Sequence, residues 1–387
     1  MGYHSIFGKI FGINTKNDKK SIKTKTTPAT TKKTNKISTN FNIVNEENDL
    51  VFDQFGNPKK LGKPIAKPGG EGCVYFLRDK PEILVKIYHT RKLDEHRNEY
   101  KNKIEAMIKL KDEFNDINVC WPLLSIYDKS RKWIGYAMKQ GIGAPMRYLA
   151  HAVAYKKFFP HLDRAVLLEY IISFLKNIQI LHSKKVCIGD YNMLNFLCDS
   201  KDINVTMIDC DSYQIKIGKK YFPCPVGSPD LTPVEHHNID FKNVIHTETS
   251  EAFSLAIIIF ECLMLGRHPY DVVGGDDPVT NLKNGNFPYK RGNKGIPEGP
   301  WRNIWTHMPI KIKKLFIQTF TEGVNHPEKR VSLEQWIEEL SIYLEDMRDG
   351  NYDKNINPLK KLIKITKKEK EDSDENENES IYENFID

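Results

Sequence analysis

A polar loop followed by an apolar segment that ends in a carboxylate is the feature that most constrains this 387-residue chain. The loop carries Asp190 and, five residues later, Asn195. Asp209 follows fourteen residues further on, directly after the apolar stretch 205–208. Oxygen-bearing side chains at these intervals can hold Mg²⁺ and orient an attacking hydroxyl at a nucleoside triphosphate. Because Asp and Asn are common in loops, the rest of the chain decides whether this interpretation holds.

The composition is that of a soluble globular protein, with 40% hydrophobic and 28% charged residues. The longest apolar run, 252–265, is too short to cross a bilayer and predicts a buried core helix, so no membrane span is expected. Seven cysteines, an odd number without a C-x-x-C pair, argue against a disulfide framework or a structural zinc site. They favour a reducing compartment, and we expect a cytoplasmic protein.

Both ends of the chain are strongly charged and poor in apolar residues. Residues 1–40 contain nine Lys and one Asp, whereas residues 371–387 contain eight acidic residues and no basic one. Such segments cannot bury enough apolar surface to fold. We therefore predict a disordered basic arm at 1–45 and a disordered acidic tail at 351–387. A nucleic-acid partner is conceivable only through the basic arm.

Hydrophobic periodicity divides the middle of the chain into two parts. Alternation predicts strands at the start, with one helical pattern among them, and the pattern becomes mainly helical after Gly141. The expected fold class is therefore α+β, with parts at 46–141 and 142–350. The expected strands are 73–77, 83–88, 119–127 and 133–138, and the expected helices are 92–110, 164–182, 250–265, 310–321 and 333–346.

A glycine cluster directly before the first expected strand, 73–77, has two interpretations. Gly69, Gly70 and Gly72 can let backbone N–H groups approach phosphates closely, or they can form a plain hairpin turn. Lys86 lies in an otherwise apolar strand, so it must face solvent or be paired, and it suits a cation over phosphates. Glu99 and Glu105 on the following helix are candidate partners. Glu105 is favoured for its place near the helix end, and a solvated Glu is the alternative.

In this order, the features resemble the protein kinase fold. Residues 227–235 are similar to the end of a kinase activation segment, and residues 250–261 are similar to the long helix that begins S-D-V-W-S. Residues 326–332 are similar to the kinase pattern D-P-x-x-R-P-S, with Arg330 at the Arg position. The similarity covers about residues 60–346. The short motifs VKIY, WIGYAM and GDYNMLN resemble those of a divergent, largely bacterial branch of protein kinases. Some members of that branch carry helix-hairpin-helix or von Willebrand-type partners. The resemblance implies a bilobal fold, with a small antiparallel-sheet N-lobe containing one helix and a larger helical C-lobe.

The resemblance also implies ATP and Mg²⁺ as cofactors and a role for each matching residue. Asp190 would take or orient the proton of the substrate hydroxyl, and Asn195 and Asp209 would bind Mg²⁺. Lys86 would contact the α and β phosphates and pair with Glu105. Arg330 would form a structural ion pair with Glu235. The nucleotide-binding residues besides Lys86 would be Gly69, Gly70, Gly72, Val74, Met138, Lys139, Gly141 and Leu197.

The chain departs from the usual kinase pattern next to its catalytic residue. Gly189 replaces the Arg that normally binds an activation-loop phosphate, so gating by such a phosphate is not expected. Asn192 replaces a Lys near the γ-phosphate, and Glu251 replaces the helix Asp that supports the catalytic loop. Asp211 is either a further metal ligand or, the favoured interpretation, a turn residue.

Three functions fit these residues. The leading one is an ATP-dependent protein kinase, Ser/Thr-directed, acting on an unknown protein substrate and capable of autophosphorylation. A pseudokinase scaffold or nucleotide-binding regulatory module is the second. A small-molecule kinase of the aminoglycoside or choline type is the third, and segment 227–235 with Arg330 argues against it because that segment serves a peptide-binding lobe.

Overall fold

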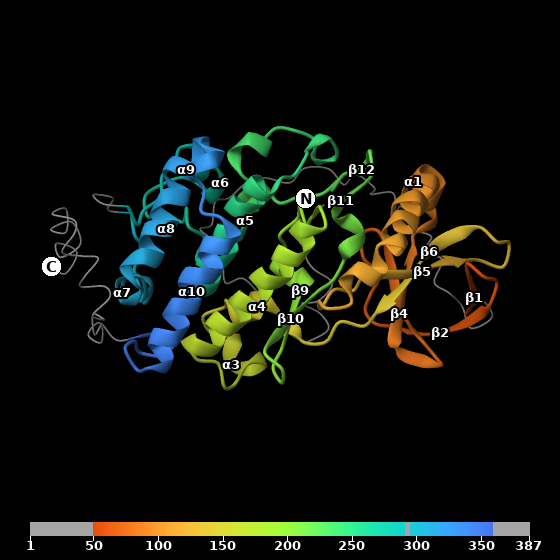
Figure 1. Ribbon diagram of the computed structural model, residues 1–387, viewed down its shortest axis with the longest axis horizontal. Coiled ribbons are helices and arrows are strands. Elements are labelled where there is room, and N and C mark those ends of the chain that lie inside the picture. Colours follow the sequence, from red (N-terminus) through yellow and green to blue (C-terminus); the bar gives the residue numbers. More distant parts are fainter. Residues whose placement is uncertain (1–48, 291–294, 359–387) are drawn as a thin grey trace, which may run out of the picture. The chain divides into compact units, whose positions relative to one another are not determined.

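The computed structural model describes residues 49–290 and 295–358, which contain both helices and strands (Figure 1). The predicted basic arm at 1–45 lies outside the described residues, as does the part of the predicted acidic tail from 359 onward. The described residues form two compact units. One comprises 49–108 and 122–140, and the other comprises 109–121 together with the described residues from 141 onward.

The first unit contains a closed antiparallel barrel with the strand order β1-β2-β3-β4-β6-β5. The predicted small antiparallel sheet is therefore closed, because β1 pairs with both β2 and β5. Sequence periodicity missed β1 and β2; the Lys- and Pro-rich β2 shows no apolar alternation. The barrel strands are β1 (Leu50–Asp53), β2 (Pro58–Pro64), β3 (Gly72–Leu77), β4 (Lys80–Tyr88), β5 (Pro122–Tyr127) and β6 (Trp133–Lys139).

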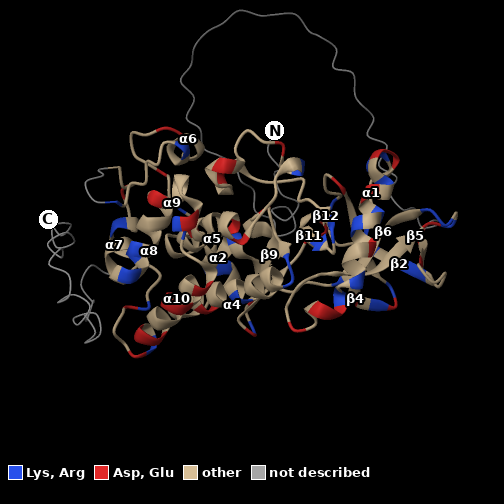
Figure 2. Cartoon of the chain, turned by 45° about the horizontal axis from the view of Figure 1, so that its top comes forward, with Lys and Arg blue, Asp and Glu red and all other residues tan. Residues whose placement is uncertain are grey.

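Apolar side chains from alternating strand positions fill the barrel, as the pleat requires. The buried cluster consists of Val51, Leu61, Tyr75, Leu77, Val85, Ile126 and Ala137. Helix α1 (Thr90–Lys109) confirms the predicted helix and packs its apolar face on the unit. Tyr100 of α1 stacks on Tyr88 of β4 with ring centroids 4.8 Å apart. The rest of α1 carries charges of both signs (Figure 2).

The second unit is mainly helical and confirms the four helices predicted there. Helix α5 is buried at every position from Ser250 to Leu263, as expected for the long apolar run. Helix α4 is long and apolar enough to cross a membrane, but 61% of that stretch is buried inside the protein, as in a core helix. The helices are α2 (Met146–Leu149), α3 (Tyr155–Phe158), α4 (Arg164–Ser183), α5 (Glu248–Leu263), α6 (Pro278–Lys283), α7 (Trp301–His307), α8 (Ile310–Phe320), α9 (Glu322–Asn325) and α10 (Leu333–Arg348).

The second unit also contains two small three-stranded sheets. The first has the order β10-β9-β7 and the second the order β12-β11-β8. The amide of Asn177 on α4 donates to the carbonyl of Val205 on β10 at 2.8 Å, which fixes the first sheet to the core helix. The strands are β7 (Ala144–Pro145), β8 (Val186–Cys187), β9 (Phe196–Asp199), β10 (Asn204–Met207), β11 (Gln214–Ile217) and β12 (Lys220–Phe222).

The folded chain continues past residue 350, where the tail was predicted to begin. The ring of Tyr352 is buried and packs on His307 of α7, with centroids 5.4 Å apart. The carbonyl of Lys354 accepts the N–H of Arg164 at the start of α4 at 2.8 Å. The described part of the predicted tail, residues 351–358, therefore belongs to the second unit.

Candidate active site

Asp190 lies in a tight loop directly after β8. Gly189 precedes it with a φ of +75°, and a Cβ at Gly189 would come within 2.6 Å of the side chain of Cys224. A larger residue would therefore be both strained and obstructed. The N–H of Asn192 donates to the carbonyl of Asp190 at 3.0 Å, and the Asn192 side chain accepts the N–H of Leu194 at 3.0 Å. The local turn thus holds the Asp190 backbone in a defined position.

The Asp190 carboxylate is half-buried and has a strongly perturbed acidity. Burial raises its pKa to about 6, and the negative charges of Asp209 and Asp230 act in the same direction. The hydroxyl of Ser228 donates to Asp190 Oδ1 at 3.3 Å and lowers the pKa in opposition. A carboxylate with a pKa near 6 is ionised at neutral pH and is a stronger proton acceptor than an ordinary Asp. This is what a general base requires.

The two predicted metal ligands flank the open end of one hairpin. Phe196 of β9 pairs with Met207 of β10, so Asn195, just before the first strand, lies beside the chain that leaves the second. The N–H of Ile208 donates to the carbonyl of Asn195 at 2.9 Å, and Asp209 follows in the left-handed conformation with a φ of +60°. Amide and carboxylate oxygens are hard ligands that suit Mg²⁺, so this donor set fits the ion.

Asp211 occupies the turn that follows the second predicted metal ligand. It lies in a single turn of 3₁₀ helix, Cys210–Ser212, and is buried. The hydroxyl of Ser212 donates to the carbonyl of Asp209 at 3.0 Å and stabilises that turn. This position agrees with the predicted turn role for Asp211.

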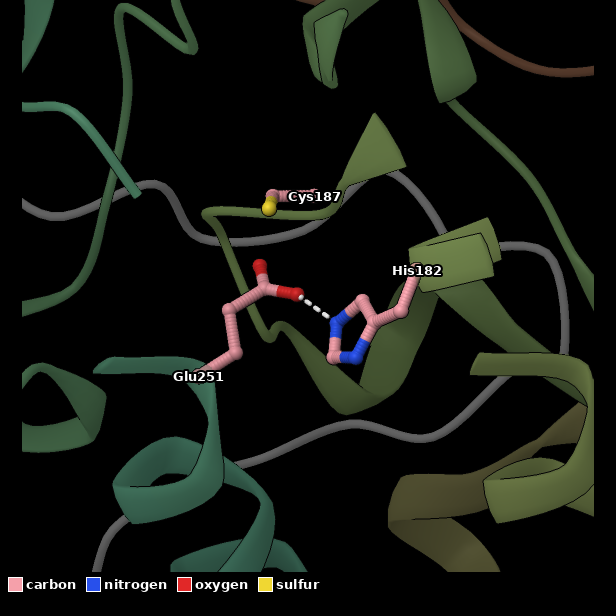
Figure 3. Close-up of side chains that lie close together, drawn as sticks. All are labelled: His182, Cys187 and Glu251. Atoms are coloured by element: carbon pink, nitrogen blue, oxygen red, sulfur yellow. Dashed lines mark hydrogen bonds and ion pairs between the residues drawn. The ribbon is translucent and has the colours of Figure 1, made fainter. Parts of the chain in front are cut away.

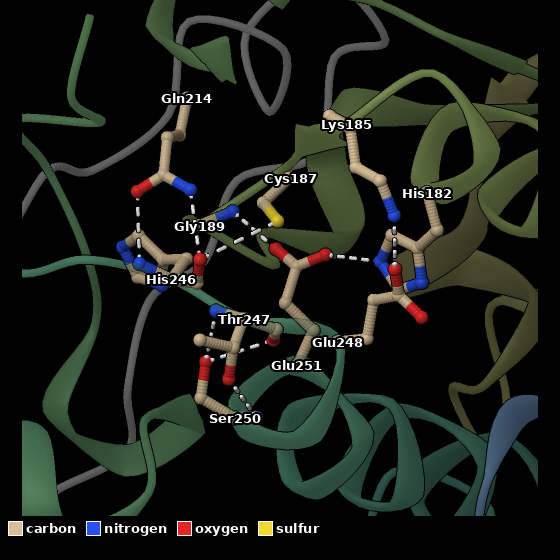
Figure 4. A network of polar contacts seen from close by, with 10 residues as sticks. All are labelled: His182, Lys185, Cys187, Gly189, Gln214, His246, Thr247, Glu248, Ser250 and Glu251. Carbon is tan, nitrogen blue, oxygen red and sulfur yellow. Dashed lines mark hydrogen bonds and ion pairs between the residues drawn. The ribbon is translucent and has the colours of Figure 1, made fainter. Parts of the chain in front are cut away.

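Glu251 at the start of α5 connects the loop that carries Asp190 to α4. Its Oε1 accepts the N–H of Gly189 at 2.7 Å, and its Oε2 lies 2.6 Å from Nε2 of His182 on α4 (Figure 3). The α5 N-terminus is fixed by a reciprocal cap between Thr247 and Ser250 (Figure 4). The carboxylate therefore ties the loop that carries Asp190 to both α4 and α5, and its contact with His182 of α4 is one that the sequence did not indicate.

His182, Cys187 and Glu251 lie close enough together to suggest a metal site, but their contacts favour a hydrogen-bond network. Their candidate ligand atoms lie within 4.8 Å of one another. Both Glu251 oxygens already accept hydrogen bonds, and the Cys187 thiol donates to the carbonyl of His246 at 3.7 Å (Figure 4). Burial also raises the pKa of Cys187, so in this network the thiol acts as a hydrogen-bond donor.

In the barrel unit, several of the predicted nucleotide-binding residues lie on adjacent strands. Val74 of β3 faces Lys86 of β4, and Met138 of β6 faces Leu84 of β4. Lys86 is buried, Met138 is 7% exposed, and the neighbouring Lys139 is exposed. Their nucleotide-binding roles remain predictions.

Two further predicted nucleotide-binding residues lie together in the second unit. A Cβ at Gly141 would come within 2.9 Å of Ile208 and 3.1 Å of Leu197. Since Ile208 immediately precedes Asp209, both predicted adenine-site residues lie beside the start of the predicted metal site. A side chain at Gly141 would displace these neighbours.

Lys86 has an acidic partner that sequence reasoning did not consider. Its Nζ lies 3.3 Å from Oε2 of Glu71, in the glycine cluster. Glu105 instead forms an ion pair with Lys101 at 3.7 Å and accepts the hydroxyl of Tyr127 at 3.4 Å. The predicted pairing of Lys86 with Glu105 remains a prediction. The sequence feature that could have indicated Glu71 as a partner is its position between Gly70 and Gly72.

The predicted ion pair between Glu235 and Arg330 is confirmed. Arg330 Nη1 and Nη2 donate to the two Glu235 oxygens at 2.6 and 2.8 Å, a bidentate geometry. Arg330 also donates through Nε to the carbonyl of Gly323 at 2.8 Å, and its side chain is fully buried. Burial would raise the pKa of Glu235, but Arg330 outweighs burial and lowers it. The segment ending at Glu235 is thereby anchored to the helical unit.

The fold and the site define a mixed α+β chain consistent with a kinase-like fold, and distant similarity to known proteins points to the same class. No protein-family model matches the chain. It is 28% identical over 286 residues to protein kinase YegI of Escherichia coli K12, covering 71% of this chain and 43% of that protein. It is 26% identical over 298 residues to protein kinase YegI of Escherichia coli O157:H7, covering 74% and 45%. The chain thus spans less than half the length of these relatives, and the homology supports a protein kinase-like family.

Proposed function

We propose that the chain is an ATP-dependent protein kinase that transfers the γ-phosphate to a Ser or Thr hydroxyl of a protein substrate. The observation that carries this proposal is the grouping of Asp190, Asn195 and Asp209: a carboxylate with a raised pKa near the open end of a hairpin flanked by two hard metal ligands. The similarity to proteins named protein kinase supports the same class.

Each residue has a role in the proposed transfer. Asp190 takes the proton of the attacking hydroxyl as the oxygen–phosphorus bond forms and the bond from the γ-phosphorus to the β,γ-bridging oxygen breaks, which leaves ADP. Asn195 and Asp209 would hold Mg²⁺, which when bound neutralises phosphate charge. Lys86 contacts the α and β phosphates. Glu251 keeps Gly189, and hence the neighbouring Asp, in place.

The hydrogen bond between Ser228 and Asp190 supports a hydroxyl-bearing peptide as substrate. Ser228 belongs to the segment that ends in the anchored Glu235, so this segment contacts the catalytic carboxylate directly. In a small-molecule kinase the segment would have no function. Gly189 offers no cation for an activation-loop phosphate, so we propose that the activity is not gated by one. The free cysteines in the structure are consistent with the proposed cytoplasmic location.

The test is phosphoryl transfer from radiolabelled ATP with Mg²⁺, using the full chain. We expect label on the chain itself or on a generic protein substrate, loss of label in Asp209→Ala, and retention in the matched control Asp202→Ala, an exposed Asp in the turn of the same hairpin. Phosphoamino-acid analysis then separates Ser/Thr from Tyr. ATP binding without any transfer would replace the proposal with the pseudokinase, and transfer to an aminoglycoside or choline alone would replace it with a small-molecule kinase.

A further inference from the structure

The glycine cluster contains one acidic side chain, and that side chain reaches the buried lysine of the barrel. Glu71 Oε2 lies 3.3 Å from Lys86 Nζ, within hydrogen-bond distance. The Lys86 side chain is 7% exposed and also lies over the ring of Tyr88, with Nζ 5.4 Å from the ring centroid. The Glu71 side chain is 34% exposed. A carboxylate that is still in contact with water thus forms an ion pair with a nearly buried ammonium group.

The backbone of the cluster is held tightly against the end of β4, which explains why the carboxylate reaches this position. The N–H of His89 donates to the carbonyl of Glu71 at 2.8 Å, and His89 Nε2 lies 2.7 Å from the carbonyl of Gly69. A Cβ at Gly72 would come within 2.2 Å of the carbonyl of Ile87, so only glycine permits this approach. The position of Glu71 is therefore a consequence of the hairpin itself.

A carboxylate at this place competes with a nucleotide for the same cation. Carboxylate and phosphate oxygens are equivalent acceptors for an ammonium group. A triphosphate brought to Lys86 would meet the negative charge of Glu71, and like charges at this separation repel. Because about a third of the Glu71 side chain is already exposed, the carboxylate can turn into water when a phosphate arrives.

We propose that Glu71 is a residue of the nucleotide site that holds Lys86 until a phosphate oxygen of the nucleotide replaces it. Binding of MgATP then exchanges one ion pair for another, and the loss of the first offsets part of the gain from the second. This inference rests on the proposed function, because it takes Lys86 as the phosphate-binding cation. It predicts that removing the Glu71 charge tightens nucleotide binding.

The test compares wild type with Glu71→Gln in calorimetric titrations of the full chain with MgATP and with adenosine. We expect Glu71→Gln to bind MgATP about three- to tenfold more tightly, the equivalent of losing one partly exposed ion pair. Adenosine, which has no phosphate, should bind both proteins equally. Asp79→Asn is the matched control, since it removes one exposed carboxylate at the other end of the same hairpin and should leave MgATP affinity unchanged.

A nucleotide-free measurement tests the ion pair itself. The shifts in denaturant midpoint for Glu71→Gln and Lys86→Met should be non-additive in the double variant, because each substitution removes the same contact. Additive shifts, or equal or weaker MgATP binding by Glu71→Gln, would overturn the inference.

The inference and the proposed function fail in different ways. If Glu71→Gln binds MgATP more tightly than wild type but no label is transferred, the proposed kinase activity is refuted and the proposed replacement of Glu71 by phosphate at Lys86 is not. If wild type transfers label but both proteins bind MgATP equally well, the kinase activity is supported and the role of Glu71 is refuted. Failure of both proteins to bind MgATP would refute both.

Discussion

Replacing Glu251 with Gln tests whether one buried carboxylate holds the catalytic loop. Glu251 is 1% exposed, and its two oxygens contact Gly189 N–H at 2.7 Å and His182 Nε2 at 2.6 Å. Gln has the same shape and retains an acceptor for Gly189. It loses the negative charge, and its amide nitrogen faces His182. The substitution therefore removes charge and one strong hydrogen bond without creating a cavity.

The expected cost follows from the two contacts. A hydrogen bond to a charged group contributes about 1.5–3 kcal/mol and one between neutral groups about 1 kcal/mol. Loss of the contact with His182 and weakening of that with Gly189 should together lower the free energy of unfolding by about 2–3 kcal/mol at about pH 6. Because Gly189 precedes Asp190, kcat should fall with little change in KM for ATP.

The stability lost in Glu251→Gln should depend on pH, because it depends on the protonation of His182. Burial lowers the pKa of His182, but the hydrogen bond and charge of Glu251 outweigh burial and raise it. A His with a raised folded-state pKa contributes stability that is fully present below its unfolded value of about 6.5 and is lost as the pH rises through the folded value. The difference between wild type and Glu251→Gln should therefore shrink between about pH 6 and about pH 9.

Denaturant unfolding at the two pH values measures this difference. Glu248→Gln is the control on the same helix. Glu248 is exposed and pairs with exposed Lys185 at 3.3 Å, so its loss should cost under about 0.5 kcal/mol. A cost for Glu251→Gln that equals the control, or that stays constant from the lower to the higher pH, would refute the reasoning.

Two further predictions concern the loop carboxylate and the segment anchor. Because the pKa of Asp190 is about 6, kcat/KM should fall as the pH drops below that value. Ser228→Ala removes a hydrogen bond that lowers this pKa, so it should shift the acid limb of the pH–rate profile to higher pH. An acid limb that does not shift would contradict this. Glu235→Gln leaves the buried guanidinium of Arg330 without its carboxylate partner and should cost about 3 kcal/mol of unfolding free energy near neutral pH. Since the folded-state pKa of Glu235 is lowered, that loss should begin to shrink below the ordinary Glu pKa of about 4.3 and should vanish only below the still lower folded-state pKa. A loss that is independent of pH in denaturant titrations would count against the pairing.

Features that depend on neighbouring residues could be predicted from the sequence. The apolar periodicity of 164–182 and 250–265 predicted α4 and α5 to within two residues at each end, because a helix face repeats over a few turns. Asn195 and Asp209 were predicted as a pair, and the hairpin between them brings their backbones together through short-range pairing. The ion pair of Glu235 with Arg330 followed from resemblance, not from periodicity.

Contacts between distant segments could not be predicted in this way. Closure of the barrel depends on β1 pairing with β5, about seventy residues later in the chain, and β2 lacks the alternation that marks a strand. Glu71 of the glycine cluster is a partner of Lys86, although the helix carboxylates were the expected candidates. The register of β3 against β4 determines that partner.

The sequence by itself therefore determined which chemical groups the chain offers and where its main helices lie, since residue type and short-range periodicity are properties of the chain. Only the tertiary structure decided how those groups behave. The pKa of Asp190 is raised by burial, and the hydrogen bond from Ser228, 38 residues away, opposes that rise; the tether at Gly189 comes from Glu251, 62 residues away. Burial and long-range hydrogen bonding exist only once distant segments pack, and these two effects set the acidity and the position of the Asp190 carboxylate.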